Sequence, residues 1–418
     1  MCLMKPISDT QMKEAKNIKS LTFNGFDLVF YRSIKEFASL LPPSNNVFLS
    51  AEYLATLEDN PPLGFQFCYV LILKNETVAG FLPFQIKHFR ADESLNFNEK
   101  QNPIVLGFKR TLAKKVNFNT LIAGSLLLTG EYSYWFDNQQ VTNSEINELL
   151  LRGVNFAKKI LTEYKIFIES VFIKDFFEPQ EVLDSDETAG CFSKEKYNRF
   201  KVEPNFIMDI PSDWHTFEDY LNALASKYRV RAKRAFKKIE TVEKKEFNEE
   251  RILAYQLEIN ALYRQVSQRS AANLVDLHEN YFLALKQNLG ERFKLYGYFS
   301  DKKLIGFYTT IENGDALDAH YLGYDETQNQ AFQTYLNFLF DIVKNGIEAG
   351  AKHIVFSRTA HEIKSSIGAI AHDMYLYLKH DRPFINRLLP YTLPILSPPE
   401  VWLPRSPFKT GKMEVEQK

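Results

Sequence analysis

The chain has 418 residues, of which 45% are hydrophobic, 14% aromatic and 25% charged. This composition excludes a largely disordered chain and indicates a packed globular protein of about two domains, since ~100 to 200 residues per domain are usual. The net charge of -1 excludes a general attraction to nucleic acid or anionic lipid, so any such binding must come from a local cluster.

The cysteines and the start of the chain bear on the compartment. Cys2, Cys68 and Cys191 lie far apart and form no CxxC spacing, which argues against a disulfide framework and against a thiolate metal site. No window reaches the ~20 apolar residues that a membrane span needs. We therefore expect a cytoplasmic protein with no transmembrane segment and no metal site.

A hairpin pattern occurs twice along the chain. Residues 65–82 predict two strands joined by the polar turn KNET, and residues 293–307 predict the same arrangement around the turn SDKK. Gly80 and Gly306 hold the same place in the two hairpins, where a missing Cβ suits a bulge or a close backbone approach. The two halves of the chain thus predict one topology.

Each hairpin is followed by a helical stretch and then a short β-rich segment. Apolar residues at helical spacing predict one helix over 144–164, before a strand at 166–168, and another over 332–347, before a strand at 353–356. Gly350 is a C-terminal stop for the second helix. Strand, helix and strand in this order imply a right-handed crossover in a mixed sheet.

The boundaries of the two units follow from the polar segments. We expect an N-terminal domain at 20–195, a C-terminal domain at 205–395 and a tail at 396–418, with the junction in the polar stretch 184–204. Repeated prolines over 383–407 predict an extended arm packed on the surface.

The second unit begins with an α-rich entry. Apolar residues from Trp214 to Ile239 keep helical spacing, with Ser212 or Asp213 available as the cap. Two further helices are predicted, over 251–265 and 277–289.

Three segments resemble a known family. The pattern WxxFxxYL followed by SKYR, within 214–229, resembles the start of the GNAT-like acyltransferase domain of predicted N-acyltransferases and of relatives of the FemABX peptidoglycan peptidyltransferases. The stretch 357–369 resembles the segment after the fifth strand in that group, except that Ser357 stands where the group often has Gly. Residues 403–409 resemble its tail, so the resemblance covers about 206–409.

The resemblance implies an α/β (α+β) protein of two tandem GNAT-like units, each a mixed sheet flanked by helices. It also implies an N-acyltransferase that moves an acyl or aminoacyl group to an amine, a reaction compatible with cell-envelope or lipid metabolism. The donor would be acyl-CoA, acyl carrier protein or aminoacyl-tRNA, bound as a substrate rather than as a permanent cofactor. The acceptor would be a small-molecule, lipid or peptide amine, and a peripheral membrane contact is compatible with these partners.

The strand predicted at 316–324 offers the best catalytic candidates. Asp318 and His320 lie two residues apart and so share one face of the strand, where His320 would take the amine proton and Asp318 would set its tautomer or bind the amine. Tyr321 faces the other way and is included as a substrate-binding residue. The alternative is that His320 is a satisfied structural histidine.

A second group follows the strand that ends at Ser357. Arg358 and Lys364 are expected to hold a carboxylate or phosphate, and Glu362 is a further candidate base. The family resemblance falls on these positions, although an ion pair on a solvated helix start would explain them equally simply.

The densest charge feature is a basic helix. Lys227, Arg231, Arg234 and Lys238 recur at helical spacing and predict one positive stripe. Such a stripe suits a phosphate-bearing partner such as a tRNA acceptor stem, a pantetheine donor or a lipid headgroup. A solvated face balanced by nearby acids is the competing interpretation.

Acyl-CoA-dependent GNAT enzymes usually carry a Gly-rich turn that grips the pyrophosphate, whereas 323–330 holds one glycine and two acids. This departure disfavours acyl-CoA and leaves a second reading open: a non-catalytic GNAT-fold module that binds tRNA, other nucleic acid or membrane phosphate. A strict peptidoglycan-branching enzyme is a weaker possibility, because no long charged helical hairpin stands out. No HExxH, Walker, GxSxG or GxGxxG motif occurs.

Overall fold

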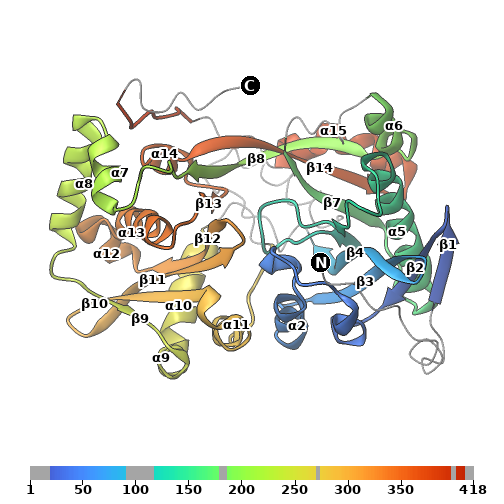
Figure 1. Cartoon of the computed structure of the whole chain (residues 1–418), viewed down its shortest axis with the longest axis horizontal. Helices are drawn as coiled ribbons and strands as arrows, with labels where there is room; N and C mark the ends of the chain where they lie inside the picture. Colours follow the sequence, from blue (N-terminus) through green and yellow to red (C-terminus); the bar gives the residue numbers. More distant parts are fainter. Residues whose placement is uncertain (1–18, 91–116, 178–185, 270–273, 397–401, 410–418) are drawn as a thin grey trace, which may run out of the picture.

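The computed structural model describes residues 19–90, 117–177, 186–269, 274–396 and 402–409 (Figure 1). Its strands are β1 Lys19–Phe23, β2 Phe26–Tyr31, β3 Phe65–Lys74, β4 Thr77–Arg90, β5 Asn117–Ala123, β6 Trp135–Phe136, β7 Ser170–Phe177, β8 Asn198–Asp209, β9 Glu243–Glu246, β10 Phe293–Ser300, β11 Lys303–Asn313, β12 Ala316–Tyr324, β13 His353–Ser357 and β14 Ile370–His380. They form one mixed sheet in the order β1-β2-β3-β4-β5-β7-β14-β8-β13-β12-β11-β10-β9, with β6 beside β4.

Helices cover this sheet and fill the space between its two halves. The α-helices are α2 Ala51–Asp59, α5 Asn143–Glu163, α6 Asp186–Lys194, α7 Phe217–Ala223, α8 Ser226–Lys238, α9 Glu249–Ala254, α10 Gln256–Ser267, α11 Tyr281–Leu289, α12 Glu326–Phe332, α13 Thr334–Glu348, α14 His361–Ser365 and α15 Pro383–Leu396. Short 3-10 helices are η1 Ile34–Glu36, η2 Ala38–Leu40, η3 Val47–Leu49 and η4 Gly290–Arg292. The predicted α/β class with two units of one topology is confirmed.

Both predicted hairpins are present and turn in the same way. In the turn between β3 and β4, Asn75 and Glu76 have φ of 50° and 63°. In the turn between β10 and β11, Asp301 and Lys302 have nearly the same values, 48° and 65°. Positive φ at both central residues gives the turn a twist that matches the strands it joins. The sequence signal for these hairpins was therefore local and complete.

The two glycines mark equivalent bulges. Register shifts directly before Gly80 in β4 and directly before Gly306 in β11 insert one extra residue into each strand. A Cβ at Gly80 would lie 2.3 Å from Phe136 Cδ1, and one at Gly306 would lie 2.8 Å from Phe338 Cζ. The prediction of a bulge and a close approach is confirmed in both units.

In each unit a helix connects two parallel strands. The predicted helices are found as α5, which leads to β7 beside β5, and α13, which leads to β13 beside β12. Gly350 follows α13 with a φ of 68°, as expected for a helix stop. Each helix buries its apolar face in the core of its own unit.

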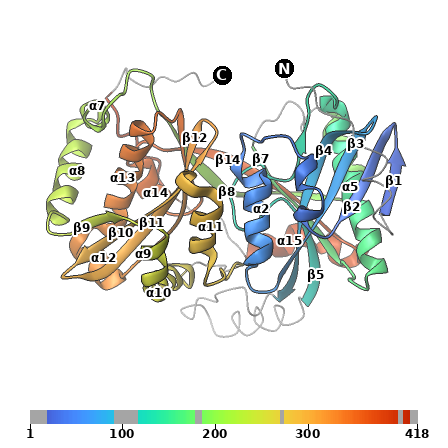
Figure 2. The same cartoon turned by 60° about the horizontal axis from the view of Figure 1, so that its bottom comes forward.

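A third core joins the units. Buried side chains of α2, such as Leu54 and Leu57, pack in one cluster with Phe282 and Leu285 of α11. Figure 2 shows these two helices side by side between the two halves of the sheet. The units thus share apolar core as well as sheet.

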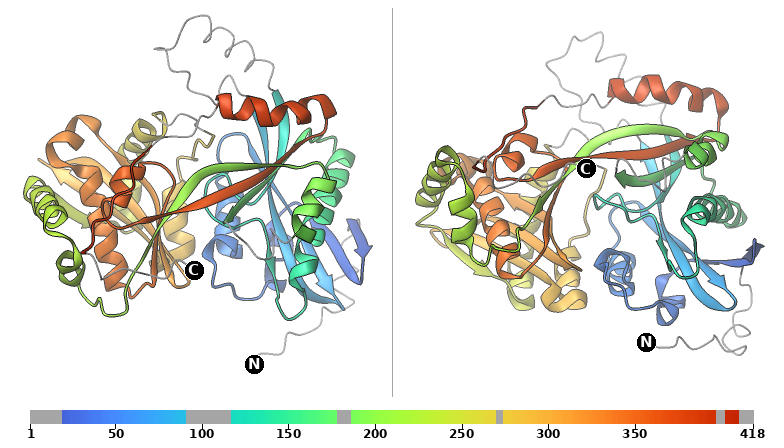
Figure 3. Two further views of the ribbon diagram at one scale, coloured as in Figure 1. Left: turned by 90° about the horizontal axis from the view of Figure 1, so that it is seen from above. Right: turned by 45° about the horizontal axis from the view of Figure 1, so that its top comes forward.

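The strands β8 and β14 form a long ribbon that crosses both units (Figure 3). One end of β14 pairs with β7 of the first unit, and the opposite end of β8 pairs with β13 of the second. The segment 184–204, expected to be a polar junction, therefore contains α6 and the start of β8. At the start of β8 the side chains alternate between exposed and half-buried positions. This alternation with a period of two residues indicates a strand, whereas the polar composition suggested a junction.

The helix predicted over 214–239 needs correction in its middle and at its cap. The single helix expected over 214–239 is two helices, α7 and α8, because Leu224 and Ala225 have extended backbone between them. The cap of α7 is Thr216, whose side chain accepts from the N–H of Asp219, and not Ser212 or Asp213.

The extended arm predicted over 383–407 is a helix in its first part. Proline is tolerated at the first position of a helix, where its missing N–H has no helical partner, and Pro383 starts α15. Residues 402–409 do pack in extended form on the second unit, while 397–401 and 410–418 lie outside the described residues. Among the helices described, none has the length and apolar character to cross a bilayer.

Gly323 in β12 lies against the backbone of α10. A Cβ there would lie 2.5 Å from both Leu262 C and Tyr263 N, and these backbone atoms cannot rotate away. We predict that Gly323→Ala lowers the thermal midpoint by several degrees, which corresponds to about 1 to 3 kcal/mol of overpacking. Gly190→Ala in α6 is the control, because a Cβ there meets nothing within 4 Å. Equal midpoints for the two variants would contradict the prediction.

Candidate functional site

The parallel strands β12 and β13 pair only at their beginnings. Ala316, Leu317 and Asp318 lie opposite His353, Ile354 and Val355, respectively, and the pairing of the two strands stops there. Beyond this point β12 continues to Tyr324, whereas β13 ends at Ser357 and pairs with β8 on its other side. The sheet of the second unit thus opens between the carboxyl ends of these two strands.

A cleft of about 640 Å³ lies beside the segments that leave those strand ends. It is lined by Lys227, Tyr228, Arg231, Arg234, Gln333, Glu362, Ile363 and Arg405. Gln333 stands between α12 and α13, and Glu362 and Ile363 belong to α14. Four of the eight lining residues are cations and one is an acid, so the cleft is suited to an anionic ligand.

The predicted basic stripe supplies most of this charge. Buried Ala232 and Ala235 hold α8 against the second core, which leaves Lys227, Arg231 and Arg234 exposed on the side of the cleft. Among the described residues none of these three makes a salt bridge. Lys238, the fourth member of the stripe, lies outside the cleft, and its Nζ is 3.5 Å from the carbonyl oxygen of Gln330.

The C-terminal segment completes the cleft. Ala225 N donates to Pro407 O at 2.8 Å, and Phe408 pairs with Leu224, which places Arg405 at the cleft wall. Arg405 Nη2 donates to Glu362 Oε2 at 3.1 Å and lowers the pKa of that carboxyl. Glu362 is therefore less suited to the role of base than the sequence suggested, and Arg405 is a cleft residue that sequence reasoning missed.

The position of the absent Gly-rich turn is occupied by the additional helix α12. The chain passes from α12 into α13 through Gln333, which has φ 49° and ψ 44°. Thr334, the first residue of α13, is fully buried, and its Oγ1 has no hydrogen-bond partner among the described residues. The start of α13, where helix N–H groups favour an anion, thus borders the cleft through Gln333.

The loop after β13 has an unusual backbone. Ser357, Thr359 and Ala360 have φ of 57°, 67° and 53°, in the region that glycine prefers. Ser357 takes the glycine-like conformation although it is not glycine. Buried Lys364 donates from Nζ to Ser357 O at 3.1 Å and also to Arg358 O.

These contacts correct the role expected for Lys364. Its ammonium is directed at the loop carbonyls and not at a ligand, and burial lowers its pKa to about 7. We conclude that Lys364 holds the loop between β13 and α14 in place.

A bulge in β12 changes the orientation of the catalytic candidates. Tyr308 lies opposite Leu322 and Thr310 opposite Ala319, so His320 and Tyr321 together oppose one residue of β11. Tyr321 therefore shares the face of His320, and the expectation that it points the other way is wrong. Its hydroxyl donates to Leu127 O of the first unit at 3.0 Å.

Asp318 and His320 face the first unit but have different partners. His320 Nε2 lies 2.7 Å from Tyr281 Oη and its ring stacks on Phe48, whereas Asp318 accepts from Asn313 Nδ2 at 3.2 Å. Burial lowers the pKa of His320 to about 3 and raises the pKa of Asp318 to about 7. The partner that orients His320 is thus Tyr281, and Asp318 is the better matched proton acceptor at neutral pH.

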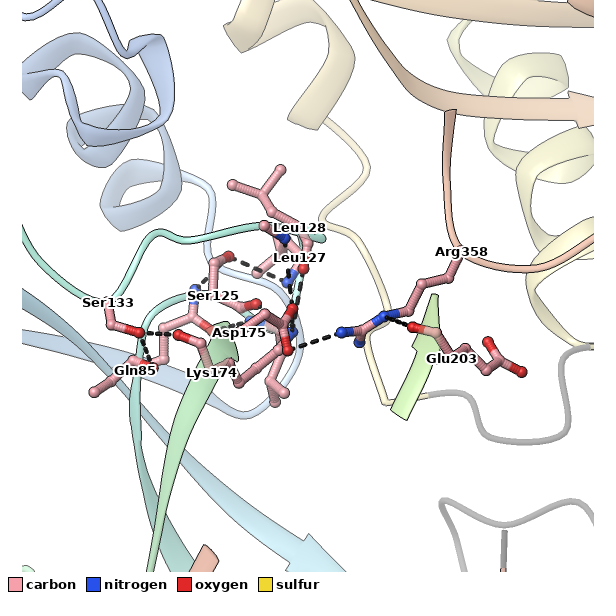
Figure 4. Close-up of polar contacts among 12 residues, drawn as sticks. Gln85, Ser125, Leu127, Leu128, Ser133, Lys174, Asp175, Glu203 and Arg358 are labelled. Carbon is pink, nitrogen blue, oxygen red and sulfur yellow. Dashed lines mark hydrogen bonds and ion pairs between the residues drawn. The ribbon is translucent and has the colours of Figure 1, made fainter. Parts of the chain in front are cut away.

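Arg358 does not line the cleft, and its side chain points toward Asp175 of the first unit (Figure 4). Its Nη2 lies 2.8 Å from Oδ1 of the fully buried Asp175 in β7, and its Nε donates to Glu203 O at 3.1 Å. Lys174 Nζ is 3.4 Å from the other oxygen of Asp175. The structure therefore gives Arg358 a protein carboxylate as its partner, where the sequence suggested a ligand.

The equivalent opening of the first unit is filled by its own chain. β5 and β7 pair from Thr120 and Ser170 onward, but the chain that follows β5 folds back over the end of β7. Lys174 Nζ donates to Ser125 O at 2.7 Å and to Leu128 O at 3.1 Å, and Ser133 Oγ donates to Lys174 O (Figure 4). This segment, residues 124–134, is called the plug.

The plug presents a carboxylate and a phenol to the contact between the units. Glu131 accepts from Phe177 N at 3.2 Å, and burial raises its pKa to about 7. Tyr132 packs edge-on against Phe48; burial raises its pKa well above the usual value, and the nearby carboxylates of Asp318, Asp175 and Glu131 raise it further. Sequence reasoning missed these residues, because their role depends on contacts between units.

Comparison with known proteins identifies the fold. No protein-family model and no curated protein sequence matches the chain. Solved structures do match: FemX has a TM-score of 0.51 at 10% identity, with 86% of this chain and 98% of FemX covered. A tandem GNAT protein from the clavulanic acid biosynthesis pathway has a TM-score of 0.49 at 8% identity, with 86% of this chain and 99% of that protein covered.

The chain has a tandem GNAT fold like that of FemX. The L-PGS structure from Bacillus licheniformis is also similar, with a TM-score of 0.43, 11% identity, and 82% of this chain and 94% of that protein covered. The predicted fold is confirmed, and the cleft of the second unit lies beside the segments that follow its two parallel strands, β12 and β13.

The buried ion pair between the units gives a stability prediction. Among the described residues, Arg358→Ala leaves the fully buried Asp175 with Lys174 as its one cationic partner, so we expect a loss of about 3 kcal/mol in the free energy of unfolding. Arg405→Ala removes a largely exposed pair and is expected to cost less than about 1 kcal/mol. Urea denaturation measures both, and similar losses would refute the assigned difference.

The pKa of Asp318 gives a pH prediction. Because the folded state raises this pKa from 3.8 to about 7, the folded protein binds more protons than the unfolded chain between these values. Its contribution to stability is therefore present below pH 4 and lost as the pH rises toward 7, by at most about 1.4 kcal/mol per pH unit. We expect Asp318→Asn to gain stability relative to wild type over this window and to keep the gain at pH 8.

The control is Asp315→Asn. Lys352 lowers the pKa of Asp315, so this variant should lose a little stability at neutral pH and should show no gain as the pH rises. Thermal melts of the three proteins from pH 4 to 8 make the comparison. A constant difference between Asp318→Asn and wild type across this range would disprove the assignment.

Proposed function

We propose that this protein is an N-acyltransferase whose second unit transfers an acyl or aminoacyl group from a phosphate-bearing donor to an amine. The observation that carries the proposal is the cationic cleft beside the opening between β12 and β13. Lys227, Arg231 and Arg234 offer charge to a phosphate without a competing salt bridge among the described residues. The tandem GNAT fold, shared with FemX and with a tandem GNAT protein, supports this class of reaction.

The two substrates would approach the sheet from its two opposite faces. Leu317 and Ala319 of β12 face the core under α13, on the side of the cleft, whereas Asp318 and His320 face the first unit. A donor anchored by its phosphate would place its acyl carbonyl in the opening between the strands. The acceptor amine would reach that carbonyl from the opposite face, between the units.

Asp318 is the proposed proton acceptor. The amine must lose a proton as it attacks the carbonyl carbon; the new C–N bond forms, the tetrahedral intermediate collapses, and the carrier leaves as thiol or hydroxyl. A carboxyl with a pKa of about 7 is well matched to this step, whereas His320, with a pKa of about 3, is a weaker base. His320 and Tyr281 would then position the acceptor by hydrogen bonds.

The donor class is the part that an experiment must decide. The cations of the cleft can bind the phosphate groups of acyl-CoA, of the pantetheine arm of acyl carrier protein and of the backbone of aminoacyl-tRNA. The absence of a Gly-rich turn at 323–330 and the presence of α12 there favour a donor other than acyl-CoA. Purified protein is therefore incubated with each donor and a panel of amines, and release of free thiol or uncharged tRNA is measured.

Substitutions in α8 test the cleft. Arg231→Gln with Arg234→Gln removes two charge-assisted contacts of about 1.5 kcal/mol or more each, so the KM for the donor should rise at least tenfold with little change in kcat. Lys233→Gln with Lys237→Gln is the matched control, because these exposed lysines lie on the same helix but do not line the cleft. Asp318→Asn should instead lower kcat by 100-fold or more.

The outcomes separate an enzyme from a binding module. Turnover by the wild type with the expected KM and kcat effects supports the transferase. A donor that is retained, lost on the Arg231 and Arg234 substitutions, and never consumed would overturn the proposal in favour of a non-catalytic phosphate-binding module.

A further inference from the structure

The helix α15 exposes an apolar stripe to solvent. Phe384, Leu388 and Tyr391 are 75%, 39% and 71% exposed, respectively. They are spaced four and three residues apart and therefore lie on one face of the helix. Exposed aromatic residues in such a continuous stripe differ from the scattered apolar residues of an ordinary protein surface.

The opposite face of α15 is fixed to the protein. Asn386 accepts at Oδ1 from His380 N at 2.8 Å and donates from Nδ2 to Lys196 O at 2.8 Å. Asn198 Nδ2 also donates to the carbonyl oxygen of Asn386 at 3.2 Å. With ~100° of rotation per residue, Phe384 and Leu388 point away from the side that carries Asn386. Figure 3 shows α15 on the outer side of the ribbon formed by β8 and β14.

The charge within α15 itself has one sign. The sequence of α15 contains no Asp or Glu, and Arg387 is exposed beside the stripe. Arg382, just before the helix, has a side chain that is 70% exposed and reaches Glu169 at 3.4 Å. Phe167, two residues before Glu169, is itself 62% exposed. Aromatic and leucine side chains flanked by arginine are typical of helices that lie in a membrane interface.

The dimensions of α15 favour contact with a lipid surface over a membrane-spanning helix or a contact with a second copy of the chain. Its 14 residues extend about 21 Å, short of the ~30 Å hydrocarbon layer, so the helix does not span a bilayer. The three exposed side chains offer roughly 400 Å², whereas a stable dimer needs about 800 Å² per partner. A second copy of the chain therefore fits the stripe less well than a lipid surface does.

We propose that α15 is an interfacial helix that binds the surface of a lipid bilayer with anionic headgroups. Phe384, Leu388 and Tyr391 enter the boundary between headgroups and acyl chains, and Arg387 binds lipid phosphate. This surface lies on the helix that follows β14, separate from the cationic cleft of α8 and α14. The inference is therefore independent of the proposed transferase activity.

Vesicle flotation of the full chain tests the proposal. The protein is mixed with vesicles of phosphatidylcholine and phosphatidylglycerol at 3:1, or of phosphatidylcholine alone, and the floated fraction is measured. The wild type should float with the anionic vesicles, and Phe384→Ser with Tyr391→Ser should lower its partition at least tenfold. Arg387→Glu should weaken binding to anionic vesicles more than to neutral ones.

Leu257→Ser is the matched control, because Leu257 is 81% exposed on α10, away from the stripe. It should float as the wild type does, and thermal melts confirm that the surface variants are folded. Three results would each overturn the proposal. The wild type fails to float, the control loses binding as the double variant does, or the Arg231 and Arg234 substitutions abolish flotation while the α15 substitutions do not.

Light scattering in the absence of lipid shows whether a second copy of the chain binds the stripe. A dimer in the absence of lipid that the Phe384 and Tyr391 substitutions dissociate would assign the stripe to self-association and overturn the membrane proposal. A monomer at the concentrations used for flotation supports it.

Discussion

The antiparallel pairing of β8 with β14 determines how the rest of the molecule is arranged. Each of these strands serves both units, since β14 also pairs with β7 and β8 also pairs with β13. Backbone hydrogen bonds tolerate little shear, so the ribbon fixes the register between the units. Asp175 on β7 and Arg358 after β13 can therefore meet at 2.8 Å although they come from different units.

The same topology gives the two units different capacities. In both, a crossover helix joins two parallel strands that begin as a pair. In the second unit the segments beyond the strands border a cationic cleft. In the first unit the plug occupies that place, and Lys174 donates hydrogen bonds to backbone carbonyls of the plug. The first unit thus contributes Glu131 and Tyr132 to the shared face, and the available cleft belongs to the second unit.

Much of the fold could be predicted because its signals are local. The hairpins, the helices α5 and α13, and the stripe on α8 follow from turn residues and from periodicity within short windows. The errors arose where a local rule was interrupted. The bulge in β12 turned Tyr321 to the face of His320, and the alternation of β8 was hidden by its polar composition. In α15, the repeated prolines predict an extended arm because proline usually ends a helix, but the segment is helical.

The candidate site was harder to predict, because it depends on distant contacts. Lys227, Arg231, Arg234 and Glu362 were found from spacing and resemblance, and the structure brings them into one cleft. Arg405 joins them only because the C-terminal segment packs beside α7 and α8. Tyr281, the partner of His320, gave no sequence signal of its own.

The ribbon also has a consequence for the order in which the chain is made. β7 leaves the ribosome long before β14, its neighbour in the sheet, and synthesis of the intervening chain takes on the order of ten seconds or more at ~5 to 20 residues per second. During that time one edge of the first unit lacks its native partner, and an open strand edge is a template for wrong pairing. The edge of β7 is therefore exposed to wrong pairing until β14 has been made.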